Sequence, residues 1–284
     1  MGLMVQFVTR GSPHLASYRL RIASPAGYLR GKGVGVGVGG FEPADVHVFS
    51  KHWDAEDLEN ALRSPCPVFD LCDDHFSGAH GVHYRLMCER CSVVCSSRRL
   101  VERVLEETGK AAVYIPEAWE YLGPSLGVRE PSSDPICLWF GHSSNLSTLG
   151  TIVPRLGKLI ICTNAQGRGI VPYSPGALWK CLEACDIVII PQEKDWKSAN
   201  RLVQSLHYGR FVVASDIPSY RGFDQYLGDI LEGVDWVRQN AGHITERIIS
   251  GRSAISSFAP ESVGRMWLNY ISDVAKRSSV ATST

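Results

Sequence analysis

The sequence has no excess charge of either sign, because its 284 residues carry 29 lysines and arginines against 29 aspartates and glutamates. Binding to bulk polyanions such as nucleic acids or anionic membranes relies on clustered cations, so this balance argues against that class of protein. Long hydrophobic runs are missing too, since no stretch approaches the roughly 18 apolar residues of a membrane-spanning helix. The composition indicates a globular protein without a membrane span.

Evidence for disulfides or a leader sequence is also lacking. The nine cysteines are an odd number, and the chain is long enough to build a core without cross-links. The apolar segment near the N-terminus is too short for a signal peptide, and Gln6 stands where a myristoylation signal has serine or threonine. We therefore expect reduced thiols and a cytoplasmic location.

Short apolar segments alternate with amphipathic ones along the chain. This alternation predicts an α/β fold with parallel sheets, because strand–helix–strand crossovers place successive strands in parallel. We expect strands at 4–9, 46–50, 68–72, 93–96, 113–116, 136–140, 158–163, 186–191 and 211–215, and helices at 20–29, 54–63, 84–90, 99–107, 177–184, 198–208, 239–250 and 260–275.

The stretch 123–135 divides this pattern, since it holds three prolines, two glycines and no periodicity. We expect it to link two Rossmann-like domains, at residues 1–125 and 134–260, and we expect a flexible tail at 277–284. Ligands of such sheets bind beyond the carboxyl ends of the strands, so the site is expected in the cleft between the two facing domains.

Two loops at predicted strand ends are suited to holding phosphate groups. The first follows the strand 136–140, and its glycine and small polar residues allow a close approach of backbone to an anion. The second leads into the helix 198–208, whose N-terminus favours an anion but opposes nearby cations. The alternatives are a simple helix cap and a solvated first turn. The candidate residues are Gly141, His142, Ser143, Asn145, Lys197, Ser198, Asn200 and Arg201.

A third group of candidates follows the strand 68–72. Two adjacent carboxylates and an imidazole, Asp73, Asp74 and His75, can raise one another's basicity and accept a proton. The alternative for the carboxylates is an Asx-type turn. Arg19 and Arg21 could meet an anionic ligand or form surface salt bridges, and a weaker cationic pair, Lys51 and His52, follows the strand 46–50.

These features together resemble the GT-B glycosyltransferases, which have two facing Rossmann-like domains. The likeness rests on the strand that ends at Pro191, the polar helix start after it, the segments 202–209 and 209–215, the sequence ASYRLR at 16–21 and the final helix. The resemblance implies that 134–260 is the nucleotide-sugar domain and that the helix 261–276 crosses back to the first domain. It also implies a UDP- or GDP-sugar as donor, no permanently bound cofactor, and metal-independent transfer to an acceptor hydroxyl.

The resemblance further assigns roles to the candidate residues. The donor pyrophosphate would lie on the loop 141–145 and the helix start 197–201, and Asp74 or Asp73, assisted by His75, would act as base. Many retaining members carry two glutamates with seven residues between them, and Trp196 and Gln204 occupy those positions here. Gln204 could still form a hydrogen bond to a ribose hydroxyl. Transfer with inversion and transfer with retention of the sugar's anomeric configuration therefore both stay open.

Other interpretations compete with this one. A metal-dependent hydrolase could use Asp74, His75, His80 and His83, and a non-catalytic nucleotide-sugar binder would explain the absent glutamates. Cys88, Cys91 and Cys95 are interpreted as small buried residues rather than zinc ligands. The glycine run 35–40 fits a dinucleotide fingerprint but opens no helix, so we expect a flexible loop. A glycan or glycolipid acceptor fits the neutral charge better than a nucleic-acid base.

Overall fold

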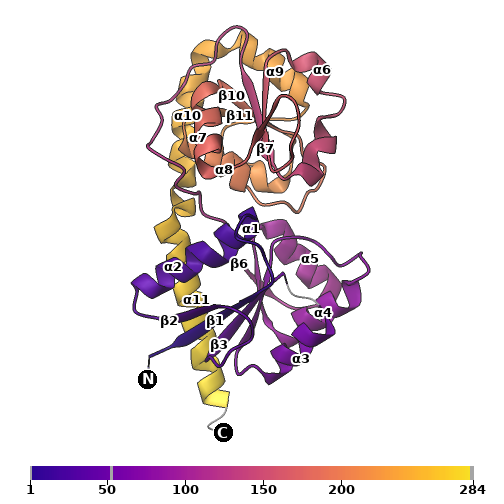
Figure 1. The fold of residues 1–284 in the computed structure, drawn as a ribbon, viewed down its shortest axis with the longest axis vertical. Coiled ribbons are helices and arrows are strands. Elements are labelled where there is room, and N and C mark those ends of the chain that lie inside the picture. Colours follow the sequence, from indigo (N-terminus) through magenta and orange to yellow (C-terminus); the bar gives the residue numbers. More distant parts are fainter. Residues whose placement is uncertain (1, 52–53, 282–284) are drawn as a thin grey trace. The chain divides into compact units, whose positions relative to one another are not determined.

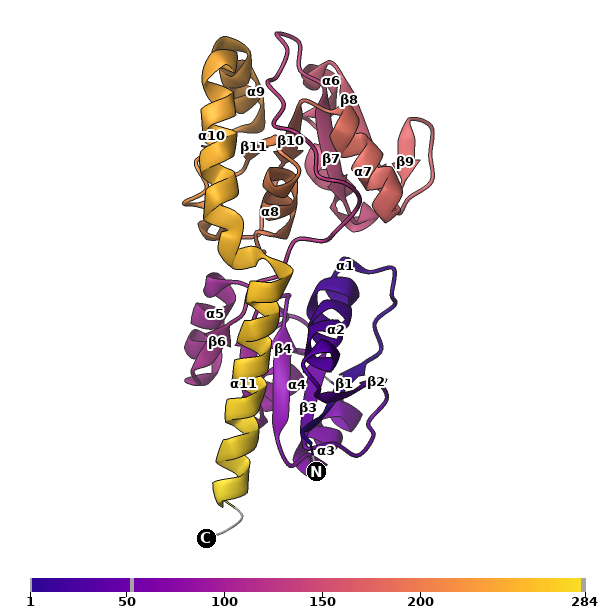
Figure 2. The same cartoon turned by 90° about the vertical axis from the view of Figure 1, so that its left-hand side faces the viewer.

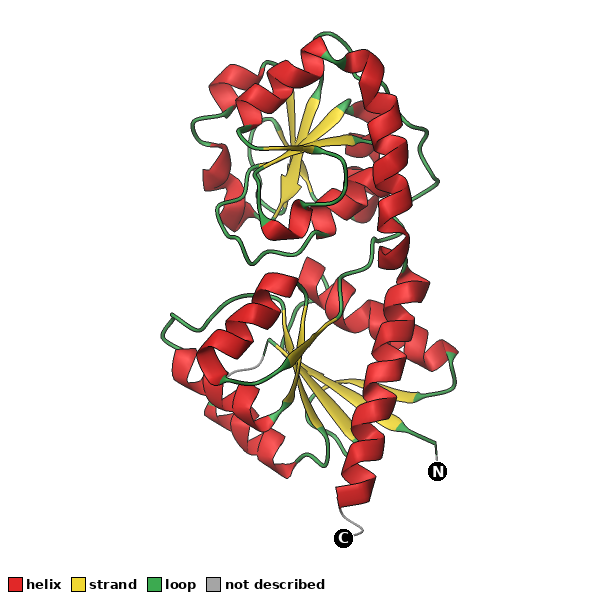
Figure 3. Cartoon of the chain, turned by 180° about the vertical axis from the view of Figure 1, so that it is seen from behind, coloured by secondary structure: helices red, strands yellow, loops and turns green. Residues whose placement is uncertain are grey.

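A computed structural model describes residues 2–51 and 54–281 (Figure 1). The chain divides into two compact units, each built on its own six-stranded sheet of parallel strands. Figure 3 shows helices on both sides of each sheet. The predicted α/β class with two Rossmann-like domains is therefore confirmed. The first unit runs to Ala118 and includes Trp196–Ser198 and the chain from Phe258 onward, and the second holds Trp119–Asp195 and Ala199–Ser257.

The sheet of the first unit has the strand order β2-β1-β3-β4-β5-β6, and every neighbouring pair is parallel. One face packs against α2 and α11, and the other against α3, α4 and α5. Its strands are β1 (Met4–Thr9), β2 (Gly35–Gly39), β3 (Val46–Ser50), β4 (Pro67–Leu71), β5 (Ser92–Cys95) and β6 (Ala112–Tyr114). Its helices are α1 (Ala16–Tyr18), η1 (Arg19–Ala23), α2 (Ser24–Gly31), α3 (Ala55–Arg63), α4 (Gly81–Arg90), α5 (Arg98–Thr108) and α11 (Pro260–Ala281).

Local signals fix the helices that follow β3 and β5. The Asp54 carboxylate accepts a hydrogen bond from the backbone N–H of Asp57 at 3.0 Å, and the Asp57 side chain accepts one from that of Asp54. This reciprocal capping box sets the start of the helix predicted at 54–63. Ser97 caps α5 by accepting a hydrogen bond from the Leu100 N–H at 3.2 Å, and Gly109, with φ of 69°, ends the helix in the left-handed conformation that glycine favours.

The glycine run forms the edge strand β2, so the expectation of a flexible loop was wrong. Its valines, Val36 and Val38, pack against the core of the first unit. The glycines between them leave room for a neighbour, since a Cβ on Gly37 would lie 1.8 Å from Oε1 of Gln6. The Gln6 amide in turn donates to the Gly40 carbonyl at 2.6 Å. Small residues here fit a strand to a buried side chain of β1.

The sheet of the second unit has the strand order β12-β11-β10-β7-β8-β9, again all parallel. The four residues of β10 are fully buried, as a continuous apolar run predicts for a central strand. Its strands are β7 (Cys137–Gly141), β8 (Leu159–Thr163), β9 (Ile170–Pro172), β10 (Ile187–Ile190), β11 (Phe211–Ala214) and β12 (Tyr226–Leu227). Its helices are η2 (Ser143–Leu149), α6 (Val153–Leu156), α7 (Pro175–Ala184), α8 (Asn200–His207), η3 (Pro218–Tyr220), α9 (Ile230–Gln239) and α10 (Ala241–Ala254), and η4 (Ile255–Phe258) follows.

The expected boundaries differ from those of the structure in two places. The first unit ends at Ala118 rather than at 125, and the expected linker belongs to the second unit. It is held there because Arg129 pairs with the nearly buried Asp186 at 2.7 Å and the Trp179 indole donates to the Pro124 carbonyl at 2.8 Å. The expected tail is helical as far as Ala281, because no glycine or proline interrupts α11 beyond Gly264.

The long helix α11 lies along the sheet of the first unit beside α2 (Figure 2). Gly264 permits this approach, since a Cβ there would lie 2.3 Å from the ring of Tyr28. Three residues further on, the fully buried Trp267 enters the core that contains β1 and β3. No helix in the described part of the chain is long and apolar enough to cross a membrane.

Candidate functional site

The loop after β4 carries a compact polar cluster within the first unit. Asp73 forms ion pairs with Lys197 at 2.6 Å and with Lys51 at 3.5 Å. A small hollow with a volume of about 10 Å³, enough for about one water molecule, opens beside them. It is lined by Lys51, Phe69, Asp70, Cys72, Asp73, His75 and Tyr84. The predicted grouping of polar residues beyond the end of β4 is therefore present, although lysines join it.

The two lysines decide the charge of Asp73. Burial opposes ionisation of this carboxyl, but the attraction of Lys197 and Lys51 outweighs it and lowers the Asp73 pKa below its usual value. A carboxylate with a lowered pKa is a poor proton acceptor. Asp73 is thus suited to holding cations in place.

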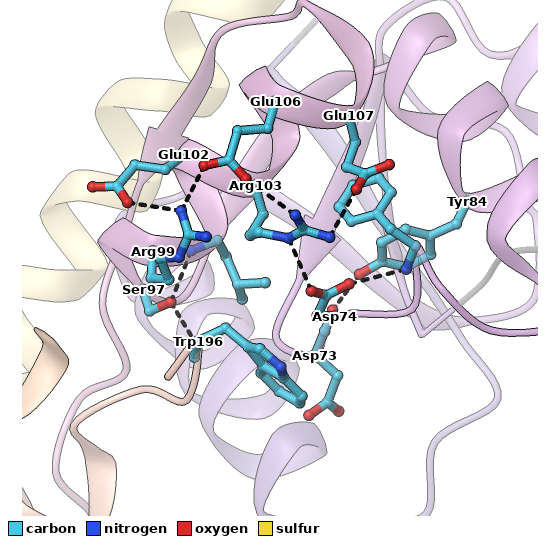
Figure 4. A network of polar contacts seen from close by, with 12 residues as sticks. Asp73, Asp74, Tyr84, Ser97, Arg99, Glu102, Arg103, Glu106, Glu107 and Trp196 are labelled. Atoms are coloured by element: carbon cyan, nitrogen blue, oxygen red, sulfur yellow. Dashed lines mark hydrogen bonds and ion pairs between the residues drawn. The ribbon is translucent and has the colours of Figure 1, made fainter. Parts of the chain in front are cut away.

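Asp74 is engaged on both carboxylate oxygens (Figure 4). One oxygen accepts from the backbone N–H of Phe76 at 3.0 Å, which is the Asx-type turn considered as its alternative. The other accepts from Arg103 at 3.2 Å, and Arg103 also bonds Glu107 on its own helix at 2.7 Å. These contacts make Asp74 a structural anchor between the β4 loop and α5, which argues against the predicted role as base.

His75 is the member of the predicted triad that suits proton transfer. Burial lowers its pKa below the ordinary value; Asp73 partly offsets this and Lys51 adds to it, so the imidazole is uncharged near neutral pH. Its ring meets the edge of Tyr84 with centroids 5.5 Å apart. The Tyr84 hydroxyl donates to the Asp73 carbonyl, which fixes the loop that carries both groups.

The three residues before α8 pack with the first unit, each held by a different strand end. Ser97 donates to the Trp196 carbonyl at 2.7 Å (Figure 4). Lys197 bonds Asp73, and the Ser198 hydroxyl donates to the buried carboxylate of Glu117. Burial raises the pKa of Glu117, and Arg21 partly offsets this.

These contacts engage two of the residues predicted to hold phosphate. The cation of Lys197 near a helix start does have an anionic partner, but it is Asp73 of the same protein. Ser198 is likewise engaged by Glu117, a residue that the sequence analysis missed. Only its position directly after the strand predicted at 113–116 could have signalled it.

Arg21 is fully buried, so it cannot meet an anionic ligand as expected. Its guanidinium pairs with the carboxylate of Asp70, which is itself buried, and donates to the Ile115 carbonyl at 2.6 Å. Because Arg21 and Asp70 neutralise each other inside the protein, neither charge is left without a partner. Arg19 is half-buried and donates to the His14 carbonyl at 2.8 Å.

In the second unit, Gly141 and Arg201 lie together as the phosphate interpretation requires. A Cβ on Gly141 would lie 3.5 Å from Nη1 of Arg201, which donates to the Phe140 carbonyl at 3.4 Å. Within the described ranges Arg201 has no carboxylate partner. Asn200 begins α8, and no side chain caps its first N–H groups. An uncompensated guanidinium, open helix N–H groups and a glycine thus converge at one strand end.

The loop after β7 is ordered by hydrogen bonds of its own. The His142 side chain accepts from the Ser144 N–H at 3.2 Å, and the Ser143 N–H donates to the Asn164 side chain at 2.8 Å. The Asn145 N–H donates to the His142 carbonyl at 2.9 Å. Asn164 follows β8 directly, and its position at a strand end is the signal by which it could have been included.

Gln204 does not present its amide for a ribose. It is buried, its oxygen accepts from the Glu120 N–H at 2.7 Å, and its nitrogen donates to the Glu120 carbonyl at 2.9 Å. These two hydrogen bonds to the backbone of Glu120 explain why an uncharged amide stands at that position. Trp196, the other residue without the expected carboxylate, packs against the hydrophobic cluster of α3, α4 and α5.

No group of three or more histidine, cysteine or acidic side chains in the described ranges is arranged to hold a metal ion. The hydrolase interpretation therefore has no geometric support. Burial raises the pKa of Cys91 to about 12 and also raises that of its neighbour Cys88, as expected of buried thiols. His52 lies outside the described residues.

Comparison with solved structures confirms the GT-B fold. The chain is similar to a sucrose-phosphate synthase from Thermosynechococcus elongatus, with a TM-score of 0.76 and 9% identity over 96% of this chain and 100% of that one. It is also similar to HepE from Anabaena in complex with UDP-glucose, with a TM-score of 0.70 and 14% identity over 95% of this chain and 100% of that one. A third similar structure is an alpha-glucosyltransferase in complex with UDP and a 13-mer DNA containing an HMU base. Its TM-score is 0.63, at 7% identity over 97% of this chain and 100% of that one. The sequence matches no protein-family model and no curated protein.

Proposed function

We propose that the protein is a glycosyltransferase that moves a sugar from a nucleoside diphosphate sugar to an acceptor hydroxyl. The observation that carries this proposal is the position of the Arg201 guanidinium beside Gly141, where it bonds the Phe140 carbonyl at the start of α8. A leaving nucleoside diphosphate gains negative charge as the glycosidic bond breaks. Arg201 and the first N–H groups of α8 would stabilise that charge, which is the task that a metal ion performs elsewhere.

Uridine diphosphate is the first donor nucleotide to test. The similar structures include complexes of HepE with UDP, with UDP and glucose and with UDP-glucose. The alpha-glucosyltransferase complex shows that this fold can accommodate a DNA acceptor in another protein. The balanced charge of this chain favours a glycan or glycolipid acceptor instead.

Calorimetry with UDP tests the donor site. The wild type should bind, and Arg201→Ala should weaken binding about tenfold to a hundredfold, as expected for lost charged hydrogen bonds. Arg155→Ala removes another arginine of the second unit and should leave the affinity unchanged. Failure of the wild type to bind UDP, GDP or ADP at millimolar concentration would contradict the proposal, and equal affinities of the two variants would contradict the placement.

For the acceptor side, we assign proton removal to His75. His75→Gln should reduce UDP release from UDP-sugar about a hundredfold or more while the UDP affinity stays constant. Because the neutral imidazole is the active form and its pKa is lowered, wild-type kcat/KM should be constant near neutral pH and fall only at a pH below that at which an ordinary histidine titrates. The exposed His80→Gln is the matched control. An unchanged rate in His75→Gln would refute this role, and binding without turnover in the wild type would indicate a non-catalytic binder.

A further inference from the structure

A second hollow lies in the first unit, at the edge of the sheet where β3 and β4 begin. Parallel strands that start at one edge end at the other, so this groove is on the opposite edge from Asp73 and His75. Its volume is about 300 Å³, which is the lower end of the range for small-molecule sites. It is lined by Phe41, Pro43, Ala44, His47, Arg63 and Pro65.

An aromatic stack forms one wall of the groove. The ring of Phe41 lies on the imidazole of His47 with centroids 4.4 Å apart and an angle of 26°. Both ring nitrogens of His47 are engaged, one with the Ser64 hydroxyl at 2.9 Å and one with the Glu42 carbonyl at 2.8 Å. The stack is therefore rigid, and the buried His47 contributes to the groove by holding the Phe41 ring in place.

Arg63, at the end of α3, supplies the charge. Its guanidinium carbon lies 5.5 Å from the centroid of Phe41, so it is held over an aromatic ring. Its side chain is exposed, and within residues 2–51 and 54–281 it forms no ion pair with a carboxylate. The groove thus combines a flat apolar wall, two prolines and one uncompensated cation with five N–H donors.

We propose that this groove binds a small planar anion, an aryl carboxylate, with its ring against the apolar lining formed by Phe41, Pro43 and Pro65 and its carboxylate on Arg63. A guanidinium matches a carboxylate in a planar, two-bonded arrangement, and the prolines shield a ring from water. The proposal is independent of nucleotide-sugar transfer, because none of the residues proposed for that reaction lines the groove.

Calorimetry with 2-naphthoate and its neutral isostere 2-naphthamide tests the proposal. The wild type should bind the carboxylate about tenfold more tightly than the amide, the effect of one charged hydrogen-bonded contact. Arg63→Gln should abolish that preference while retaining the amide affinity. Arg265→Gln removes an exposed arginine of α11 and should behave as the wild type does.

A second variant fills the groove without changing charge. Ala44→Trp should prevent binding of both probes while UDP binding, measured alongside, stays as in the wild type. The proposal is overturned if the wild type binds neither probe at millimolar concentration, if it binds both equally, or if Arg63→Gln keeps the preference for the carboxylate. Thermal melts of each variant establish that the comparison is made on folded protein.

Discussion

Ion pairs formed within the chain decide which polar residues remain available for a ligand. Lys197 and Arg201 are both cations beside the start of α8, and the sequence cannot distinguish them. The structure does, because Lys197 is neutralised by Asp73 whereas Arg201 bonds only uncharged groups in the described ranges. The same reasoning separates His75 from Asp74, whose carboxylate is already taken by Arg103.

The pairing of Asp73 makes a prediction about stability and pH. Asp73→Asn leaves Lys197 and Lys51 near each other without their shared anion, and the free energy of unfolding at pH 7 should fall by about 1–2 kcal/mol. The folded-state pKa of Asp73 is lowered, so its contribution is fully present above the unfolded value of about 3.9 and is lost as the pH falls through the folded value. Urea unfolding at pH 7 and at successively lower pH measures this.

The control for Asp73→Asn is a carboxylate whose ion pair is solvated. Asp235 pairs with Arg238 one turn along α9 and its side chain is 62% exposed, so Asp235→Asn should change stability by no more than about 0.5 kcal/mol. A loss in Asp73→Asn that persists unchanged to the lowest pH would show that the amide disturbs packing and that the ion pair is not the cause.

At the scale of helices and strands, the sequence was most informative where a pattern depends on neighbours in the chain. The run Met4–Thr9 and the run Val46–Ser50 are strands with the predicted limits, and the N-cap at Asp54 is present. Where a distant residue decides, sequence reasoning failed. The strand Gly35–Gly39 depends on the side chain of Gln6, and the segment 123–135 depends on Asp186.

The candidate site follows the same division. Strand ends were predictable, and so was the collection of polar residues beyond them, because parallel strands bring their carboxyl ends to one edge. The burial of Arg21 by Asp70, and the double hydrogen bond between Gln204 and the backbone of Glu120, involve residues 49 and 84 positions apart. No local pattern encodes such pairs, so the sequence identified side chains without showing which were already engaged.

At the scale of the whole molecule, the first unit is assembled from both ends of the chain. The helix α11 packs beside α2, which lies more than two hundred residues earlier in the chain. Trp267 contacts the core of β1 and β3, and the guanidinium of the buried Arg21 lies 5.1 Å from its ring centroid. The core of this unit is therefore complete only when the last helix is in place, whereas the second unit closes its core between Trp119 and Ser257.

Trp267→Ala tests this dependence. Removing a fully buried indole should lower the free energy of unfolding by about 3–5 kcal/mol, because the cavity is left against Phe7 and Arg21. Met266→Ala, one residue earlier and 37% exposed, should cost no more than about 1 kcal/mol. Hydrogen exchange locates the effect: amides of β1 should exchange faster, while those of β10 in the second unit keep their wild-type rates. Equal acceleration in both strands would mean that the two cores unfold as one cooperative body.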